Sequence, residues 1–181
     1  MRTWWSAIDT THSSYEEMKH RKIVAQGWRN LGDIGTLARF IPDAKGSFVQ
    51  VIQLLGDAAY RGESWWEMKD RNQTRAPAVM WNLFSVERGD IVVALEGREV
   101  RGLCQVEANA ADSYRYDQPW QYAQTIGFPV TWHDWDASLG SPPNAPNRGI
   151  LGIRKLLDES DLVRSAWAKV QENTGSEPDD D

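Results

Sequence analysis

The clearest pattern of hydrophobic and polar positions lies in the segment GDIVVALEGREVRGLCQVEA, residues 89–108. A continuous apolar run is followed by the polar stretch Glu96–Glu99 and then by a second run in which apolar and polar residues alternate. Alternation with a period of two is typical of a strand with one buried face, and a short Gly-containing stretch between two such runs is typical of a turn. The pattern therefore predicts a β-hairpin.

Other segments have the composition and spacing of further strands and short helices. Strands are predicted over RTWWSAI (2–8), KIVAQGW (22–28), the apolar end of WWEMKDRNQTRAPAVMWNLFSV (65–86) and FPVTWHDW (128–135). A brief helix or turn follows Ser13–Ser14, because serine before Glu16 and Glu17 is a capping pattern. The run SFVQVIQLLGDAA (47–59) has helical spacing at Phe48, Val51, Ile52, Leu54 and Leu55.

A last helix follows a loop. SLGSPPNAPNRG (138–149) is a loop by composition. Ser160 or Asp161 is the expected N-cap of the helix after it, whose apolar face comprises Leu162, Val163, Ala166, Trp167 and Val170. The chain has no internal repeat. Together the elements predict one α+β domain built on a small barrel or curled sheet.

Length and composition narrow the class of protein. A chain of 181 residues is long enough for one core, and no apolar run reaches the roughly 18 residues that a membrane span needs. The segment MRTWWSAIDTTHSS (1–14) lacks the hydrophobic stretch of a signal peptide. Cys104 is the single cysteine, so no internal disulfide forms, and a reducing cytoplasm is expected. Its apolar strand pattern predicts a buried filler rather than a nucleophile.

The formal net charge of −6 is unevenly distributed. Residues 172–181 carry five acidic side chains and no Lys or Arg, so the rest of the chain is close to neutral. We therefore expect a folded domain over residues 1–171 and an acidic disordered tail or linker over 172–181. A near-neutral body predicts weak nonspecific binding to phosphates, because such binding depends on Lys and Arg.

Tryptophan is unusually frequent: the chain has ten, against four phenylalanines. Core packing alone would use more Leu, Ile, Val and Phe, so the excess indicates flat surfaces that grip a planar ligand. For any single tryptophan a place in the core is an equally good interpretation, but it does not account well for all ten.

Catalytic motifs are absent from the sequence. It contains no G-x-S-x-G, no P-loop and no dinucleotide-binding glycine fingerprint. His133, Asp134 and Asp136 are close in sequence, but neighbours on a strand point to opposite faces, so a solvated cluster fits better than a metal site. We expect no enzymatic activity, no cofactor and no metal, although a hydrolase with an unfamiliar motif stays open.

Four segments in order resemble the bacterial branch of the YTH/EVE/PUA-like superfamily. They are TWWSAID (3–9), VAQGWRNLGDIG (24–35), the hairpin segment 89–108 and IGFPVTWHDWD (126–136), and SPPNAPNRGI (141–150) matches the loop that follows. The resemblance implies a PUA-like, YTH/EVE-type fold: a small curled β-barrel of about five to six strands surrounded by short helices. EVE-like modules of this family read modified bases within modification-dependent restriction systems.

The resemblance also implies an aromatic cage for the base. One cage tryptophan of YTH-like readers ends the strand after the first helix, which here is Trp28, and a second ends a later strand, which is Trp132. Gly27 is expected to relieve crowding where Trp28 leaves the sheet. The third wall varies within the family, and Trp135 and Leu139 are both candidates.

Residues near the end of the first strand hydrogen-bond the base edge in these readers. This points to Ser6, Asp9 and the neighbouring main chain. Of the adjacent Trp4 and Trp5 only one can face the pocket, since side chains alternate along a strand, and Trp5 is the candidate. Asp33 is expected to stabilise the turn after Gly32.

Candidates for phosphate contacts are the hairpin arginines Arg98 and Arg101, together with Arg148 in the loop. Arginines at a hairpin turn are more often simply soluble surface, which is the alternative for Arg98 and Arg101.

The leading hypothesis is a non-catalytic module that binds DNA and reads a modified base flipped into the cage. Extruding a base costs a few kcal/mol, which stacking walls of about 1–3 kcal/mol each can offset. An effector nuclease or NTPase in another domain or subunit would supply any cleavage. The alternative is an RNA-binding or RNA-modification accessory domain. The sequence leaves open whether the base is 5-methylcytosine, 5-hydroxymethylcytosine, N6-methyladenine or another.

Overall fold

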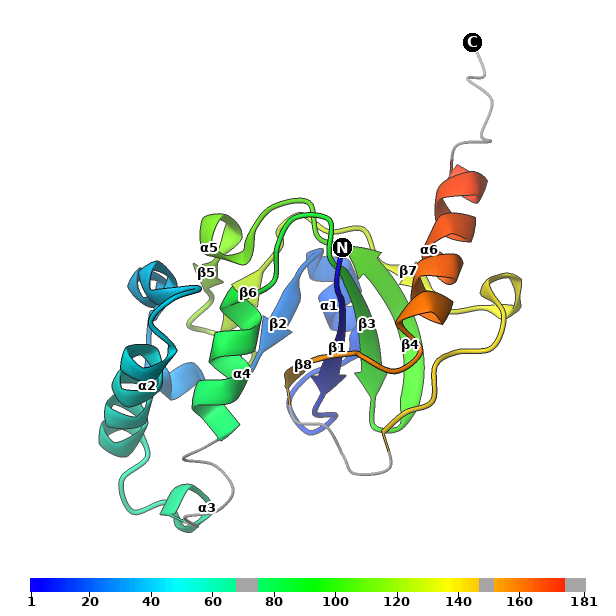
Figure 1. Ribbon diagram of the computed structural model, residues 1–181. Coiled ribbons are helices and arrows are strands. Elements are labelled where there is room, and N and C mark those ends of the chain that lie inside the picture. The colour runs from blue at the N-terminus through cyan, green and yellow to red at the C-terminus, as the bar shows by residue number, and fades with distance from the viewer. Residues whose placement is uncertain (68–74, 147–151, 175–181) are drawn as a thin grey trace.

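The computed structural model describes residues 1–67, 75–146 and 152–174, and in this part of the chain the protein is α+β (Figure 1). The strands are β1 (Thr3–Ile8), β2 (Val24–Gln26), β3 (Ile91–Glu96), β4 (Glu99–Gln105), β5 (Arg115–Tyr116), β6 (Gln124–Ile126), β7 (His133–Asp134) and β8 (Ile153–Lys155). The α-helices are α1 (Tyr15–Arg21), α2 (Lys45–Ala59), α3 (Ser64–Glu67), α4 (Arg75–Phe84), α5 (Ala110–Ser113) and α6 (Ser160–Thr174). Short 3₁₀ helices are η1 (Arg29–Leu31), η2 (Gly35–Phe40) and η3 (Ala137–Leu139).

The strands form two sheets. The larger has the order β7-β4-β3-β1-β8, and the smaller has the order β2-β6-β5. β1 runs parallel to β3, and every other pair is antiparallel. β3 and β4 are the predicted hairpin, in which Glu96 pairs with Glu99 across a turn where Gly97 has φ +63°. This confirms the hairpin.

The expected small barrel is not found in the described residues, where the strands form two open sheets. β1 and β2 approach each other through side chains: Nε2 of Gln26 donates a hydrogen bond to Oγ of Ser6 at 3.3 Å. No backbone ladder joins these two strands in the described part of the chain. The α+β class is therefore correct, and the closure of the sheet is not.

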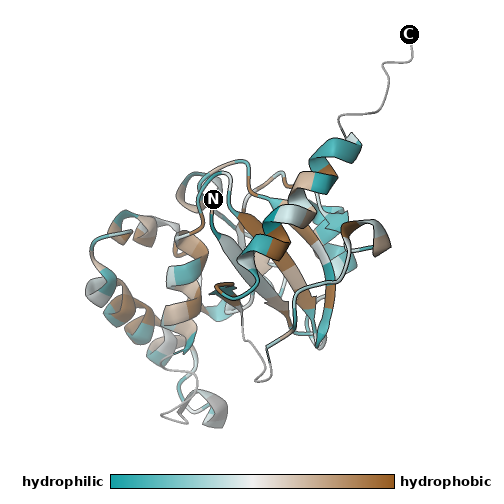
Figure 2. Ribbon diagram, turned by 45° about the vertical axis from the view of Figure 1, so that its right-hand side comes forward, coloured by the Kyte–Doolittle hydropathy of each residue, from teal (hydrophilic) through white to brown (hydrophobic). Residues whose placement is uncertain are grey.

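The larger sheet separates two hydrophobic cores. Side chains alternate along β1, so Trp4 packs into the larger core, with α1, α2 and α4, and Trp5 packs into the smaller core beneath α6. Figure 2 shows α6 crossing in front of the largely hydrophobic strands of this sheet. The predicted face of α6 is buried at Val163, Ala166 and Val170. The helix begins at Ser160, so the expected N-cap at Ser160 or Asp161 is wrong.

The predicted strand at the apolar end of 65–86 is instead helix α4. Four of its six buried residues, Ala76, Val79, Met80 and Leu83, are spaced by three and four positions, and the other two are Pro77 and Phe84. A short apolar run fits a buried strand or a buried helix, and here the i, i+3, i+4, i+7 spacing decides for the helix. Pro77 lies in the first turn, where a missing backbone N–H breaks no hydrogen bond.

The predicted strand over residues 128–135 is mostly irregular. Only β7 pairs, with β4, and β6 ends before Phe128. Pro129 has no N–H to contribute to a ladder. The loop predicted over 138–149 is irregular as far as residue 146, apart from the 3₁₀ turn η3, and its remainder lies outside the described residues.

The domain boundary expected at residue 171 falls inside α6, which continues to Thr174. The rest of the predicted tail, residues 175–181, lies outside the described residues.

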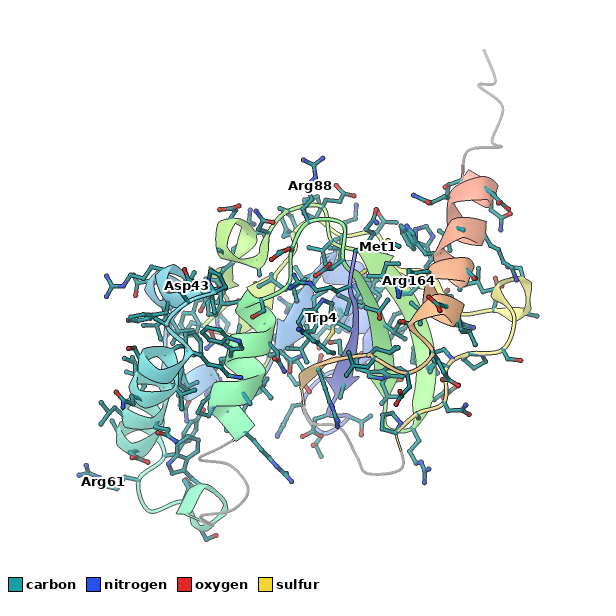
Figure 3. The ribbon with its side chains drawn as sticks, viewed as in Figure 1. Met1, Trp4, Asp43, Arg61, Arg88 and Arg164 are labelled. Atoms are coloured by element: carbon teal, nitrogen blue, oxygen red, sulfur yellow. The ribbon has the colours of Figure 1, made fainter. Side chains whose placement is uncertain are left out.

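A buried carboxylate joins the start of β1 to the start of β3. Asp90 is 2% exposed and accepts hydrogen bonds from the backbone N–H of Arg2 (2.8 Å) and from Nε1 of Trp4 (2.9 Å). It also accepts from Arg2 Nε (3.0 Å) and from the N–H of Glu87 (3.1 Å). Figure 3 shows Trp4 at the centre of the molecule. Three of these four hydrogen bonds come from Arg2 and Trp4 and fix the first strand in the core, and the fourth, from Glu87, closes the turn before β3.

Candidate functional site

A cavity of about 510 Å³ lies where β1 and β2 end beside α2 and α4. Its lining comes from segments far apart in the sequence: Asp9, His12, Gln26, Gly27, Trp28, Arg29, Asn30, Tyr60, Val79, Gln121, Tyr122 and Gly152. Its volume is within the range of about 300–1,000 Å³ that small-molecule sites occupy. Three aromatic side chains and a few polar groups give it the composition of a binding site for a flat, partly polar ligand.

Trp28 stands at the exit of β2 with a left-handed backbone, φ +65° and ψ +38°. Such a conformation is unusual for a bulky residue and costs of order 1–3 kcal/mol unless its surroundings enforce it. The expected role of Gly27 is not supported, because a Cβ at Gly27 would meet only the carbonyl oxygen of Gln121, at 4.0 Å. The strain of leaving the sheet therefore lies on the tryptophan.

The loop that carries Trp28 is held from behind by Gln124, a fully buried residue of β6. Nε2 of Gln124 donates to the carbonyl oxygens of Trp28 (3.2 Å) and Gly32 (3.1 Å), and its Oε1 accepts from the hydroxyl of Tyr114 (2.5 Å). The hydroxyl of Tyr116 donates to the carbonyl of Arg29 at 2.9 Å. These bonds offset the strain and fix where the indole ring stands.

Two further aromatic rings support the indole of Trp28. Tyr60 and Trp66 contact it edge-to-face, with ring centroids 6.2 and 6.0 Å away. Trp66 is fixed by Gly56 of α2, since a Cβ there would stand 2.1 Å from its ring. Trp28 therefore packs on one side against rings and remains half-buried in the cavity wall.

The polar groups of the cavity include two phenols, the Asp9 carboxylate and the Arg29 guanidinium, beside the amide side chains and the imidazole named above. Burial raises the pKa of Tyr60 and of Tyr122 to about 12, although backbone hydrogen bonds with Asn30 and Asp9 oppose the rise. The N–H of Asp9 donates to Oη of Tyr122 at 2.5 Å. The side-chain hydrogen bond from Thr11 lowers the pKa of the exposed Asp9 carboxyl. At neutral pH the cavity thus offers neutral hydroxyl groups, and its lining also carries one carboxylate, from Asp9, and one guanidinium, from Arg29.

The structure brings some of the predicted site residues together. Trp28 and Asp9 line the same cavity, and Ser6 lies behind it, hydrogen-bonded to Gln26. The other predicted wall does not join them: Trp132 is 5% exposed in the larger core, and its Nε1 donates to the carbonyl of Ile23 at 2.9 Å. Trp132 is therefore part of the core and not a wall of the Trp28 cavity.

The remaining predicted base-binding residues lie elsewhere. Trp5 and Leu139 are buried in the smaller core, on the opposite side of the sheet from Trp4. Trp135 is half-buried, and its Nε1 donates to the carbonyl of Gly140 at 3.0 Å. None of the three lines the Trp28 cavity.

The predicted phosphate-binding arginines differ in their surroundings. Arg101 lies 3.3, 3.6 and 4.0 Å from carboxylate oxygens of Glu99, Glu96 and Glu16, which offset its charge. Arg98 is exposed at the hairpin turn and forms no ion pair within the described residues. It lines a second hollow of about 740 Å³ with Trp5, Arg154 and Lys155. Arg148 lies outside the described residues.

Tyr60, Tyr122 and Gln26 are among the cavity residues that the sequence did not reveal. Tyr60 follows an amphipathic helix and Tyr122 lies in an irregular segment, so neither belongs to a local pattern that marks a site. Gln26 gave the only available signal, as a polar residue inside the apolar strand Val24–Gln26.

The residues considered for metal binding are engaged separately. Asp134 accepts hydrogen bonds from Lys19 and Tyr15, and Asp136 caps η3. Within residues 1–67, 75–146 and 152–174, no three His, Cys, Asp or Glu side chains are grouped to hold a metal ion. The predicted burial of Cys104 is confirmed: its side chain is enclosed in the larger core, and burial raises the pKa of its thiol. No helix in the described ranges has the length and apolarity to span a bilayer.

The left-handed backbone of Trp28 yields a test in solution. Trp28→Gly and Trp28→Ala remove the same indole, but only glycine adopts positive φ without a steric penalty. Holding alanine at positive φ costs the folded state about 1–2 kcal/mol. Glycine avoids this cost, but it gives the unfolded chain more conformational entropy, which lowers the stability of the fold by only about 0.4–1 kcal/mol. We therefore expect the glycine variant to be the more stable in urea unfolding, by about 0.5–1 kcal/mol.

The same two substitutions at Trp135 are the control, because Trp135 does not have positive φ. There the alanine variant should be the more stable. The same order at position 28 would show that the left-handed conformation is not populated in solution.

Comparisons of the chain with protein-family models, with curated proteins and with solved structures give no match.

Proposed function

We propose that this protein is a non-catalytic reader that binds DNA and holds a modified nucleobase in the cavity lined by Trp28, Tyr60 and Tyr122. The observation that carries the proposal is Trp28 itself. A strained backbone, an irregular loop fixed by a buried glutamine and two supporting rings all hold one indole in the wall of a cavity. Strained backbone conformations cluster at functional sites such as ligand-binding sites. Packing a hydrophobic core does not by itself require such a conformation.

The chemistry of the lining supports a planar heterocycle. Indole and phenol rings stack on a base with about 1–3 kcal/mol per base, which offsets the few kcal/mol needed to extrude it from a duplex. The Asp9 and Gln26 side chains supply polar atoms beside the rings. As part of the same proposal, the two open sheets correspond to the curled sheet of a PUA-like domain, and an effector nuclease or NTPase elsewhere in the system would act on the bound DNA.

Phosphate contacts are proposed for the second hollow. Arg98, Arg154 and Lys155 line it, with Asp158 and Glu159. The mixed charge predicts few neutralised phosphates and a shallow dependence of affinity on salt. Specificity would then rest on the cavity, because phosphate contacts carry no information about the base.

The test is a binding panel of short duplexes that differ by one modified base, at a fixed salt concentration. The wild-type protein is expected to prefer one modified duplex over the unmodified one. Trp28→Ala should weaken that complex by about 1–3 kcal/mol, the range for losing one stacking wall. Binding to the unmodified duplex should change much less.

Trp135→Ala is the matched control, since it removes a half-buried tryptophan outside the cavity. It should leave the preference for the modified duplex intact. A preference that survives Trp28→Ala would overturn the proposed site, and tight binding of a single-stranded RNA instead of the duplexes would favour an RNA-binding role.

A further inference from the structure

Gln26 is a buried polar side chain that lines the cavity. It is 2% exposed, and its Nε2 donates to the fully buried Oγ of Ser6 at 3.3 Å. Its Oε1 accepts no hydrogen bond from the described residues. The enclosed side-chain atoms that lack any partner there are Trp120 Nε1, Arg164 Nε and Trp167 Nε1. Oε1 of Gln26 is not among them, so this oxygen opens into the cavity.

Gly152 leaves room for that oxygen. A Cβ on this residue would stand 2.6 Å from Oε1 of Gln26 and 2.5 Å from Cγ1 of Val79, and Gly152 has φ +70°. Any side chain at position 152 would therefore press on the carboxamide, and glycine keeps the space beside it open.

Because this oxygen opens into the cavity and accepts no hydrogen bond from the described residues, its donor must be water or a bound ligand. A donor supplied by a ligand would satisfy it. Resting on the proposed function, we propose that Gln26 determines specificity by accepting a hydrogen bond from the N–H of an exocyclic amino group, so that the cavity selects an amino-bearing base. Ser6 acts as a positioning residue, because it holds the other end of the carboxamide.

Matched pairs of bases test this acceptor role. In each pair only the first member has an N–H on an exocyclic amino group: 5-methylcytosine with thymine, 5-hydroxymethylcytosine with 5-hydroxymethyluracil, and N6-methyladenine with N6,N6-dimethyladenine. Each base is placed opposite an abasic site in the same duplex, so that the cost of extrusion is similar. The wild-type protein should prefer the first member of the best-bound pair by about tenfold or more.

Gln26→Leu keeps the apolar stem and removes the carboxamide. The ratio of affinities for the two members of a pair should therefore fall to about one, which means no preference. Gln26→Glu keeps an acceptor oxygen, and the preference should persist. Circular dichroism and melting curves establish that each variant is folded, and the glutamate variant gives a second test if the leucine variant is not. Trp28→Ala should weaken both members of a pair to the same extent.

These outcomes separate the two proposals. If the wild-type protein binds no member of any pair, both the reader function and the role of Gln26 are overturned. If Trp28→Ala weakens binding while Gln26→Leu leaves the preference unchanged, only the role of Gln26 is wrong. A preference for thymine or 5-hydroxymethyluracil would also overturn it, because those bases present a carbonyl group where cytosine has its amino group.

Discussion

Trp132→Ala is expected to lower the free energy of unfolding by about 3–5 kcal/mol, the usual cost of truncating a large buried aromatic side chain. Trp132 is 5% exposed, contacts Tyr15 edge-to-face with centroids 5.7 Å apart, and donates a hydrogen bond to the carbonyl of Ile23. The substitution leaves a cavity between α1 and the segment before β7 and removes the donor for a buried carbonyl. Urea unfolding followed by circular dichroism measures the loss.

Trp28→Ala is the comparison for that measurement. Its indole is half-buried, and its removal enlarges a cavity that already exists, so its cost in stability should be clearly smaller. The two variants should thus have opposite profiles: Trp132→Ala unfolds easily and Trp28→Ala binds poorly. If folded Trp132→Ala instead kept wild-type stability and lost preference for the modified duplex, Trp132 would be a wall of the site after all.

The difference between these two tryptophans shows what local sequence can predict. The sequence Gly-Trp-Arg-Asn-Leu-Gly-Asp, residues 27–33, marks a place where a strand ends abruptly. In the structure Trp28 lies at that end. Trp132 was likewise predicted to end a strand. Whether an indole in that position is buried or exposed depends on which elements pack over it. Over Trp132 these are Tyr15 of α1 and Ile23, the residue before β2, and no pattern near residue 132 reveals either contact.

The aromatic residues that line the cavity with Trp28 could not be predicted from local sequence either, because tertiary packing brings them to the site. Tyr60 and Tyr122 are 32 and 94 positions further along the chain, and they reach the cavity through the packing of α2 and of the segment before β6. Asp9 and Ser6 were predicted from the resemblance alone, which places the residues that contact the base edge near the end of the first strand. Sequence reasoning thus located the part of the cavity at Trp28 and Asp9, and tertiary packing brings the other lining residues to it.

Helices and hairpins with a strong period were predicted correctly, and weakly periodic segments were not. The hairpin β3–β4 follows its hydrophobic spacing. Helix α2 forms over the predicted run with Phe48 and Ile52 buried, but Leu54 and Leu55 of its expected apolar face are exposed. The error over α4 arose because β-branched and aromatic residues in a short apolar run favour a strand on composition, whereas their burial has helical spacing. That error matters for the site, because Val79 of α4 lines the cavity beside Gln26.

Asp90→Ala is expected to be as damaging as Trp132→Ala, at about 3–5 kcal/mol, because it removes the acceptor of several hydrogen bonds, and each buried donor left without a partner costs about 1–3 kcal/mol. Four donors lose their acceptor: the N–H groups of Arg2 and Glu87, the Arg2 guanidinium and the Trp4 indole. The indole of Trp4 is fully buried and cannot turn to water instead. Asp117→Ala is the control, since its ion pair with Arg21 is partly exposed and such pairs contribute about 0–1 kcal/mol.

The same carboxylate gives the fold a dependence on pH with a definite sign. Burial alone would raise the pKa of Asp90, but the hydrogen bonds from Arg2, Trp4 and Glu87 outweigh it and lower the pKa below its usual value. A lowered pKa in the folded state means that the unfolded chain takes up the proton first as pH falls. An aspartate in the unfolded chain titrates at about pH 3.9. The contribution of Asp90 to the free energy of unfolding is therefore complete well above pH 4, and it is lost progressively as pH falls below about 3.9. Asp90→Asn cannot titrate, so its unfolding free energy should fall less steeply than that of the wild type in this acid range. Equal slopes for the two proteins would show that folding does not lower the pKa of Asp90 and that other carboxylates determine the acid sensitivity of the fold.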